Sequence, residues 1–589
     1  MRRFASALLL GAAVVSAGSA HAHEGDACGQ GDRFEEFSGP LRELAKRRIE
    51  WVSSLLKKEH PTARVQLLGF NDFHGQLTDG RRVSNRPVGG AAVLASYLRD
   101  EQARFNGETL IIHAGDHVGA SPPESALLQD EPSISFLNML GNRHCTRTVQ
   151  FHPLCNLVGT LGNHEFDEGV AELKRLIFGG NHANGPFLEP RWTGAKFPYV
   201  SSNVIDDDTG DTLLRPFVIK EANGVLVGVI GAVLEGTPSI VTPEGVEGVS
   251  FVDEADAINA QVRKLKLLGV ETIVVTIHQG GFQASYAGPT HGDATGPTGE
   301  IAEIVKRLDS AVDVVISGHS HTFTNALMPN ASGHPILVTQ AFSSSTAYAE
   351  IELTVDRVTR DVVTKSASVV TTYADVAPGN APSTDVAALV QQAKDRTAPL
   401  VNRVVGQASV AITRTQSPAG ESALGNLIAD SQRAEAGADI ALMNPGGIRA
   451  DLDAGPITWG ELFTIQPFGN TLVSMDLTGA QVLRVLEQQW TATSTRFLQI
   501  SGLSYVWNPS KPIGSRVVSA QVGGAAIDPT RTYRVVANNF IAGGGDGFTV
   551  LTEGTNVIGG AVDLDALIAY VEGLGAPVGT VIEGRITQP

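Results

Sequence analysis

Gly162-Asn163-His164-Glu165-Phe166-Asp167 is the stretch that decides the fold. It follows an apolar run at 157–161 that is typical of a buried strand, and its glycine and polar side chains are typical of a turn. Because the carboxyl ends of strands in an α/β sheet meet at one edge, such motifs predict a shared site. Further motifs follow strand-like runs in the same way: Asn71-Asp72-Phe73-His74, Gly115-Asp116-His117, Ile277-His278-Gln279-Gly280 and Gly318-His319-Ser320-His321.

From residue 64 onward, apolar strands alternate with helices. We expect strands at 65–70, 109–113, 154–160, 225–233, 272–277 and 312–316, and helices at 90–104, 255–268 and 299–308. Further β-structure, at 336–340 and 349–355, is expected to close this part of the chain. The alternation predicts an α/β layered domain.

The chain has 589 residues, which is too long for one hydrophobic core, so two or more domains are expected. A net charge of −18 argues against a surface that binds nucleic acid polymers. An anionic substrate would then need local cations, either metal ions or placed arginines.

The N-terminus has the pattern of a secretory signal peptide over residues 1–22. Arg2 and Arg3 precede an apolar run at 5–15, and Ala20-His21-Ala22 provides a small-x-small cleavage site. A transmembrane anchor is the alternative, but this run is too short and no comparable run follows. We therefore expect export to the periplasm or the extracellular space, without a membrane anchor.

Three cysteines fit an oxidising compartment. Cys145 and Cys155 are close in sequence, which favours a local disulfide and leaves Cys28 as the odd thiol. Pairing of Cys28 with either of the others stays open.

The composition suggests boundaries between parts of the chain. Residues 23–60 are expected to form an N-terminal helical extension, with helical spacing at 40–58, and residues 61–373 the first domain. An Ala- and Pro-rich stretch at 374–382 and a helix at 384–401 predict a linker and hinge over 374–402. A second, α+β domain is expected over 403–589, with strands at 440–443, 471–477 and 534–538 and helices at 422–436 and 478–489.

The polar motifs have the composition of a two-metal site. Two divalent cations close together can polarise a phosphoryl group and activate a shared water. They need a bridging carboxylate and further His, Asp and Asn ligands, a set that suits Zn, Mn, Fe or Co. Any one histidine is more often structural, but seven such residues after successive strands favour a metal centre: Asp72, His74, Asp116, Asn163, His278, His319 and His321.

This ordered set resembles the calcineurin-like metallophosphoesterases, and the span from about 64 to 560 resembles the 5′-nucleotidase family. The resemblance implies a four-layer αββα sandwich followed by an α+β substrate-binding domain. It implies one metal on Asp72, His74, Asp116 and His321, and a second on Asp116, Asn163, His278 and His319, with Asp116 bridging. His113, His117 and Gln279 are left in structural or supporting roles.

His164 adjoins the candidate ligand Asn163, and Asp167 is near enough in sequence to orient it and stabilise its charged form. The resemblance implies that this pair stabilises the transition state or the leaving group, while helix capping by Asp167 is the alternative. No serine or cysteine nucleophile stands in a motif. We therefore expect direct attack by a metal-bridging hydroxide, with inversion at phosphorus.

Three further motifs match the second domain of the resembled family: Asn444-Pro445-Gly446-Gly447-Ile448-Arg449, Pro467-Phe468-Gly469-Asn470 and the Gly-rich segment at 539–548. The resemblance implies that Phe468 and Phe540 sandwich a nucleobase and that Asp546 binds the ribose hydroxyls. It further implies a polar contact from Asn470 to the base. Asn444 and Arg449 belong to a loop where the arginine offers phosphate a bidentate fork.

The chain departs from the family just before Glu421. Ser417-Pro418-Ala419-Gly420 stands where phosphate-binding arginines usually occur, and only Arg414 is nearby. A strict preference for 5′-mononucleotides therefore does not follow from the resemblance.

The leading hypothesis is an exported dimetal nucleotidase that converts extracellular nucleotides to nucleoside and phosphate. The alternatives among enzymes are a 2′,3′-cyclic nucleotide phosphodiesterase/3′-nucleotidase, a UDP-sugar hydrolase and a thiosulfohydrolase. The alternative outside enzymes is a nucleotide-binding surface protein that has kept the fold.

Overall fold

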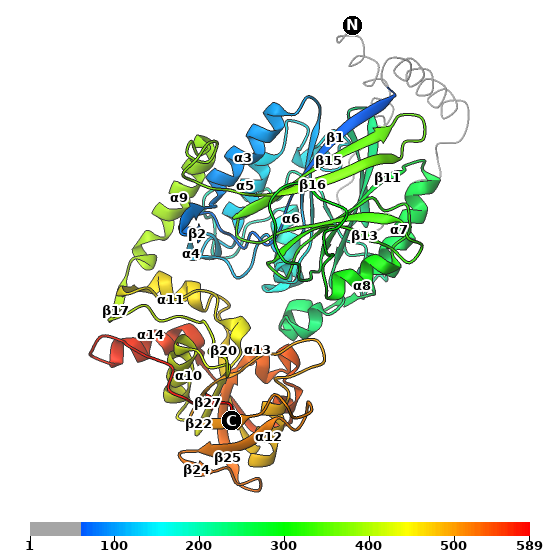
Figure 1. The fold of residues 1–589 in the computed structure, drawn as a ribbon. Helices are drawn as coiled ribbons and strands as arrows, with labels where there is room; N and C mark the ends of the chain where they lie inside the picture. Colours follow the sequence, from blue (N-terminus) through cyan, green and yellow to red (C-terminus); the bar gives the residue numbers. More distant parts are fainter. Residues whose placement is uncertain (1–60) are drawn as a thin grey trace.

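The computed structural model describes residues 61–589, so the expected signal peptide, the N-terminal helical extension and Cys28 lie outside the described residues. Two bodies follow one another along the chain (Figure 1). The first contains two six-stranded sheets, and the second is built on a five-stranded sheet.

The first sheet of the first body mixes parallel and antiparallel strands. Its spatial order is β16 (Val362–Thr371), β15 (Ala347–Asp356), β1 (Thr62–Phe70), β4 (Thr109–His113), β5 (Leu157–Thr160) and β6 (Tyr199–Val200). β1, β4, β5 and β6 run parallel, and every residue of β4 and β5 is buried, as expected for parallel strands covered on both faces.

The second sheet has the same plan. Its order is β13 (Phe323–Pro329), β14 (Pro335–Ala341), β12 (Val314–Ser317), β11 (Thr272–His278), β9 (Val225–Val233) and β8 (Phe217–Ala222). The four central strands are parallel, and β8 and β13 run antiparallel at the edges.

The two sheets pack face to face, and helices cover their outer faces (Figure 1). The core between the sheets is rich in valine, leucine and isoleucine, and includes Val65, Ile112, Val229 and Val274. The first sheet is covered by α3 (Ala91–Arg104), α5 (Glu131–Leu140) and α6 (Gly169–Phe178), and the second by α7 (Glu254–Leu267) and α8 (Glu300–Arg307). This is the four-layer αββα sandwich predicted from the sequence.

Strand register brings the polar motifs to one edge. Phe70 lies beside His113, and His113 lies beside Gly159, so β1, β4 and β5 end at the same level. In the second sheet Ile277 lies beside Ser317. Loops far apart in sequence therefore leave the sandwich side by side.

Most predicted elements of this body are confirmed, with shifted ends. The strand expected at 154–160 begins only at Leu157, because Leu154 and Cys155 belong to a turn. A Cys145–Cys155 disulfide closes that turn, with Cα atoms 4.5 Å apart, and so confirms the predicted pair. The strand expected at 312–316 runs over Val314–Ser317, and β13 was not predicted.

The second body is α+β, as predicted. Its main sheet has the order β21 (Gln499–Ser501), β18 (Ile440–Met443), β25 (Thr532–Asn538), β20 (Thr471–Thr478) and β26 (Thr555–Val562). A smaller sheet joins β24 (Ala525–Ala526), β23 (Val517–Val522), β22 (Leu503–Trp507) and β27 (Ile586–Thr587), and β17 (Val404–Ala408) pairs with β19 (Gly455–Thr458). The helices are α10 (Ala423–Ala436), α11 (Trp459–Ile465), α12 (Gly479–Glu487), α13 (Asn539–Ala542) and α14 (Asp563–Gly573).

Helix α9 (Thr384–Val401) connects the two bodies (Figure 1). It packs against α3, α5 and the short α4 (Pro123–Ala126) of the first body and against α11 of the second. Leu127, just after α4, also packs against the core of the second body. Among residues 61–589, none of the helices has the length and apolar character needed to cross a membrane.

Candidate metal centre and substrate pocket

The candidate metal ligands leave the strands in strained loops. Among non-glycine residues a positive φ is uncommon, and it concentrates at sites where the surrounding structure fixes the backbone. Five of the seven candidates have one: Asp72 (49°), His74 (48°), Asp116 (48°), His319 (75°) and His321 (56°). The fold therefore fixes unusual backbone geometry where the predicted site lies.

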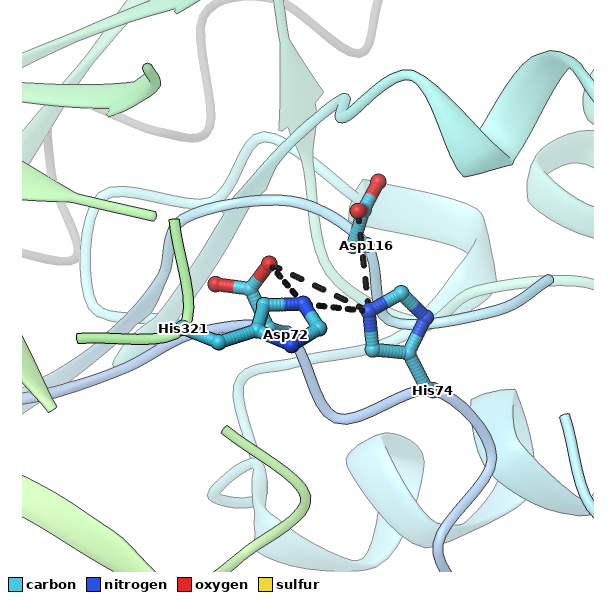
Figure 2. Close-up of side chains that lie close together, drawn as sticks. All are labelled: Asp72, His74, Asp116 and His321. Atoms are coloured by element: carbon cyan, nitrogen blue, oxygen red, sulfur yellow. Dashed lines mark hydrogen bonds and ion pairs between the residues drawn. The ribbon is translucent and has the colours of Figure 1, made fainter. Parts of the chain in front are cut away.

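Four candidates form one tight group: Asp72, His74, Asp116 and His321. The Nε2 atoms of His74 and His321 are 3.0 Å apart, and His321 Nε2 is 3.1 Å from Asp72 Oδ1. His74 Nε2 is also 3.7 Å from Asp116 Oδ2. Figure 2 shows these side chains directed at one another from three different loops.

A second group shares Asp116 with the first and adds His278 and His319. His278 Nε2 is 3.0 Å from Asp116 Oδ2. Asn163 joins this group through its Oδ1, which is 3.0 Å from His319 Nδ1. The structure thus brings together all seven predicted candidates in two clusters that meet at Asp116.

The donor set fits divalent cations. Nδ1 of His74 donates to the carbonyl of Gly119 at 2.9 Å, and Nδ1 of His278 donates to that of Ala114 at 2.7 Å. These bonds leave both Nε2 atoms facing the cluster, as in metal sites where the second ring nitrogen is held by the protein. Within residues 61–589 neither Asp72 nor Asp116 forms an ion pair with a lysine or arginine, so imidazoles are the ion-pair partners of these two buried carboxylates.

Glu165 ties the loops of this centre together. Its buried carboxylate accepts backbone N–H groups from Asp116 at 2.9 Å, from His117 at 2.8 Å and from Gly162. A side chain at Gly162 would collide with the Asp116 carboxylate, which explains the glycine there. Burial and then the charge of Asp116 raise the pKa of Glu165 to about 7. This scaffolding role was not predicted from the sequence.

Replacing Glu165 with glutamine is expected to weaken metal binding by about 10- to 100-fold, the usual effect of losing a group that supports ligands. The amide would turn an N–H donor toward backbone N–H donors. Calorimetric titration with Mn²⁺ or Zn²⁺ measures the effect, and Glu168→Gln, an exposed neighbour, is the control. Equal metal affinity in a folded Glu165→Gln protein would show that the loops hold their shape without this carboxylate.

His164 and Asp167 form a pair beside the cluster. His164 Nδ1 is 2.6 Å from Asp167 Oδ2, and the backbone N–H of His164 donates to Asp116 Oδ1 at 2.9 Å. Burial disfavours the charged ring, but the Asp167 and Asp116 carboxylates outweigh that effect and raise the pKa of His164. Asp167 makes no side-chain cap to α6, so its contact is with the histidine.

A cavity of about 220 Å³ opens between the two bodies next to this pair. It is lined by Asn163, His164, Asp167 and His319 of the first body and by all six predicted substrate residues of the second, namely Asn444, Arg449, Phe468, Asn470, Phe540 and Asp546. The structure therefore places the two predicted sets of site residues around one space.

Phe468 closes the cavity on the metal side. Its ring stacks on His164 at a centroid distance of 5.6 Å, and the Arg449 guanidinium lies 5.7 Å from the ring centroid. In the part of the chain that the structure describes, the rings of Phe468 and Phe540 make no contact with each other. Phe540 packs instead on Gly545.

The far end of the cavity is polar and held in place. Asn444 Nδ2 donates to Asp546 Oδ2 at 2.9 Å, and its Oδ1 accepts from Asn538 at 2.9 Å. Burial raises the pKa of Asp546, against the charge of Arg496. Arg496 Nε lies 3.4 Å from the other carboxylate oxygen of Asp546.

Sequence reasoning missed Arg496 and the segment at 240–242, which also line the cavity. Arg496 is a single basic residue in a loop, without a motif of its own. The residues left in structural roles are accounted for: His117 stacks on Phe73 at 4.6 Å, and buried His113 packs against Tyr199. The backbone N–H of Gly280 donates to Gln279 Oε1.

Comparison with known proteins supports this arrangement. A calcineurin-like phosphoesterase model matches residues 65–323, and a 5′-nucleotidase C-terminal domain model matches residues 404–553. The crystal structure of a 5′-nucleotidase precursor from Thermus thermophilus superposes with a TM-score of 0.73 at 31% identity, covering 89% of this chain and 99% of that one. The chain belongs to the 5′-nucleotidase family. It is therefore a metal-dependent phosphoric ester hydrolase.

Two curated relatives of this 5′-nucleotidase family member are longer than the part of them that this chain matches. The endonuclease YhcR of Bacillus subtilis is 35% identical over 538 residues, covering 90% of this chain and 41% of YhcR. The cell wall protein Lmo0130 of Listeria monocytogenes is 34% identical over 551 residues, covering 87% of this chain and 67% of that protein. The chain thus spans less than half the length of the first of these relatives.

Proposed function

We propose that this chain is an exported nucleotidase that uses two divalent cations to hydrolyse phosphate esters of extracellular nucleotides, giving nucleoside and phosphate. The observation that carries the proposal is the single cavity whose wall includes both the His164–Asp167 pair and the Phe468, Phe540 and Asp546 side chains. A phosphoesterase that acts on small esters without specificity would not need two aromatic rings and a carboxylate in the cavity that adjoins its metal centre.

The cavity suits the parts of a nucleotide. A base between Phe468 and Phe540 would stack, and stacking tolerates different bases. Asp546, held by Asn444, would accept hydrogen bonds from the ribose hydroxyls. Asn470 offers an amide to the base, and Arg449 offers a fork to the phosphate.

The candidate ligands would hold two cations. One cation would be held by Asp72, His74, Asp116 and His321, and the other by Asp116, Asn163, His278 and His319. When bound, the cations would supply charge that polarises the phosphoryl group and lowers the pKa of a water molecule.

The His164–Asp167 pair would act on the leaving group. Asp167 orients the imidazole through Nδ1 and stabilises its protonated form, which leaves Nε2 to donate a proton to the departing alkoxide. Arg449 and the stacked Phe468 cover this space from the second body, which excludes water from the reacting group.

Export is supported by the signal-like pattern over residues 1–22 and by the Cys145–Cys155 disulfide, since disulfides persist in oxidising compartments. One relative is described as a cell wall protein, which agrees with a role outside the cytoplasm. We propose a periplasmic or extracellular location.

Phosphate release from a substrate panel tests the proposal. With Mn²⁺ or Zn²⁺ bound, kcat/KM for AMP should exceed that for ribose 5-phosphate by about 5- to 100-fold, because only AMP carries a base to stack. Chelation should abolish release, and added metal should restore it. 2′,3′-Cyclic AMP and UDP-glucose test the two alternative nucleotidase activities. Equal rates on AMP and ribose 5-phosphate would refute a role for the aromatic pair.

A further inference from the structure

Residues 417–420 of the second body supply no cation to the phosphate. The segment forms a turn in which the Gly420 N–H donates to the Ser417 carbonyl at 2.9 Å. A side chain at Gly420 would collide with the Phe497 ring, so the position has no room for a basic residue. Cations near the metal centre must therefore come from other elements.

Arg81 is one such cation, and it belongs to the first body. It begins the hairpin of β2 (Arg81–Val83) and β3 (Arg86–Val88), on the side of the first body that faces the second, near α4 and α9 (Figure 1). Its Nε donates to Gln76 Oε1 at 3.2 Å. Gln76 is buried two residues after His74, so Arg81 is attached to a loop of the metal centre.

Arg414 belongs to the second body and lies beside the loop that carries Arg449. Its Nη1 donates to the carbonyl of Ile448 at 3.0 Å, and its backbone N–H donates to Asp451 at 2.8 Å. Ile448 directly precedes Arg449. Arg414 is thus hydrogen-bonded to the loop that contains Arg449.

The positive charges of Arg414 and Arg449 act on Arg81, and that of Arg414 acts on Arg449. Surrounding protein atoms and then the positive charges of Arg414 and Arg449 lower the pKa of Arg81, although the residue is exposed. Arg449 is less exposed than Arg81: burial lowers its pKa, and the charge of Asp116 is the largest influence that opposes this effect. Among residues 61–589, none of the three arginines forms an ion pair with a carboxylate.

Like charges held together by the fold repel unless an anion lies between them. The charges come from both bodies, so the repulsion acts between the two bodies. A phosphate dianion at the metal centre would relieve it and could take forked hydrogen bonds from each guanidinium.

We propose that Arg81 is a phosphate-binding residue supplied by the first body, and that it forms with Arg414 and Arg449 a cluster that binds the phosphoryl group and the released phosphate. The inference rests on the proposed function in that the anion is taken to be phosphate. Arg81 lies in a hairpin outside every sequence motif. Phosphate would then be bound by residues of both bodies rather than by residues of the second body alone.

Titration of the metal-loaded full chain with inorganic phosphate tests the proposal, because it needs no turnover. Arg81→Ala should weaken phosphate binding about 10-fold, the usual loss for one charge-assisted hydrogen bond to a partly exposed group. Arg81→Lys should recover part of the loss, since it keeps the charge without the fork. Binding of adenosine and the metal content should not change.

Arg82→Ala is the matched control, because Arg82 is the next residue on the same strand, points to the opposite face and donates to the Asn85 carbonyl at 2.8 Å. If Arg81→Ala misfolds, Arg81→Gln, which keeps a donor for Gln76, takes its place. Unchanged phosphate affinity in the Arg81 variants, or an equal loss in Arg82→Ala, would overturn the proposal. Failure of the wild-type protein to release phosphate from AMP would count against the proposed function, while the phosphate titration would still decide the role of Arg81.

Discussion

Asp116→Asn is expected to lower kcat/KM for AMP by at least about 10³-fold, one of the two largest effects that we expect from a single replacement. Asp116 belongs to both candidate ligand groups, and its Oδ2 lies 3.0 Å from His278 and 3.7 Å from His74. The amide keeps the shape of the side chain but removes the negative charge that two cations would share. Both metal occupancy and rate should therefore fall together.

The measurement is metal content per chain beside initial rates of phosphate release. Asp313→Asn is the control, because Asp313 is also a buried carboxylate of the first body but pairs with Lys365, away from the ligand loops. An Asp116→Asn protein that keeps full metal content and activity would contradict the bridging role.

His164→Ala is expected to lower kcat on AMP by about 10²- to 10⁴-fold, the range for loss of a general acid. Metal content should stay at the wild-type level, because His164 belongs to neither ligand group. Since the proposed role is to protonate the leaving group, the loss should be much smaller on p-nitrophenyl phosphate, whose phenolate leaves without a proton. Asp167→Asn should show the same pattern more weakly.

The comparison of the two substrates decides how His164 acts. A loss of equal size on AMP and p-nitrophenyl phosphate would mean that the imidazole stabilises the phosphoryl group rather than the leaving group. His291→Ala, at an exposed histidine of the same body, controls for general effects of replacing a histidine.

Much of the centre could be predicted from sequence because its residues lie directly after buried strands. β4 and β11 are apolar throughout most of their length, and parallel strands in register deliver their following loops to one edge. The residues after Phe70 and His113 could thus be placed together without knowing the structure. The start of β5 was less predictable, because the Cys145–Cys155 disulfide closes a turn just before it and the strand begins only at Leu157.

What could not be predicted depends on contacts between segments with no local pattern. Glu165 looks like any helix-initiating acid, and its bonds to the loop of Asp116 exist only in the folded chain. Arg496 and Arg81 are single basic residues of a kind found in many loops, and their roles depend on their contacts with Asp546 and Gln76. Such roles follow from packing between distant segments, which periodicity does not encode.

The central claim is that loops from both sheets of the first body hold two cations that meet at Asp116. Crystals soaked in Mn²⁺ or Zn²⁺ and measured at the absorption edge of the metal test it most directly. We expect two anomalous peaks about 4 Å apart, the spacing of two-metal hydrolases, one within reach of Asp72, His74 and His321 and the other within reach of Asn163, His278 and His319. A single peak, or no peak between these side chains, would contradict the account.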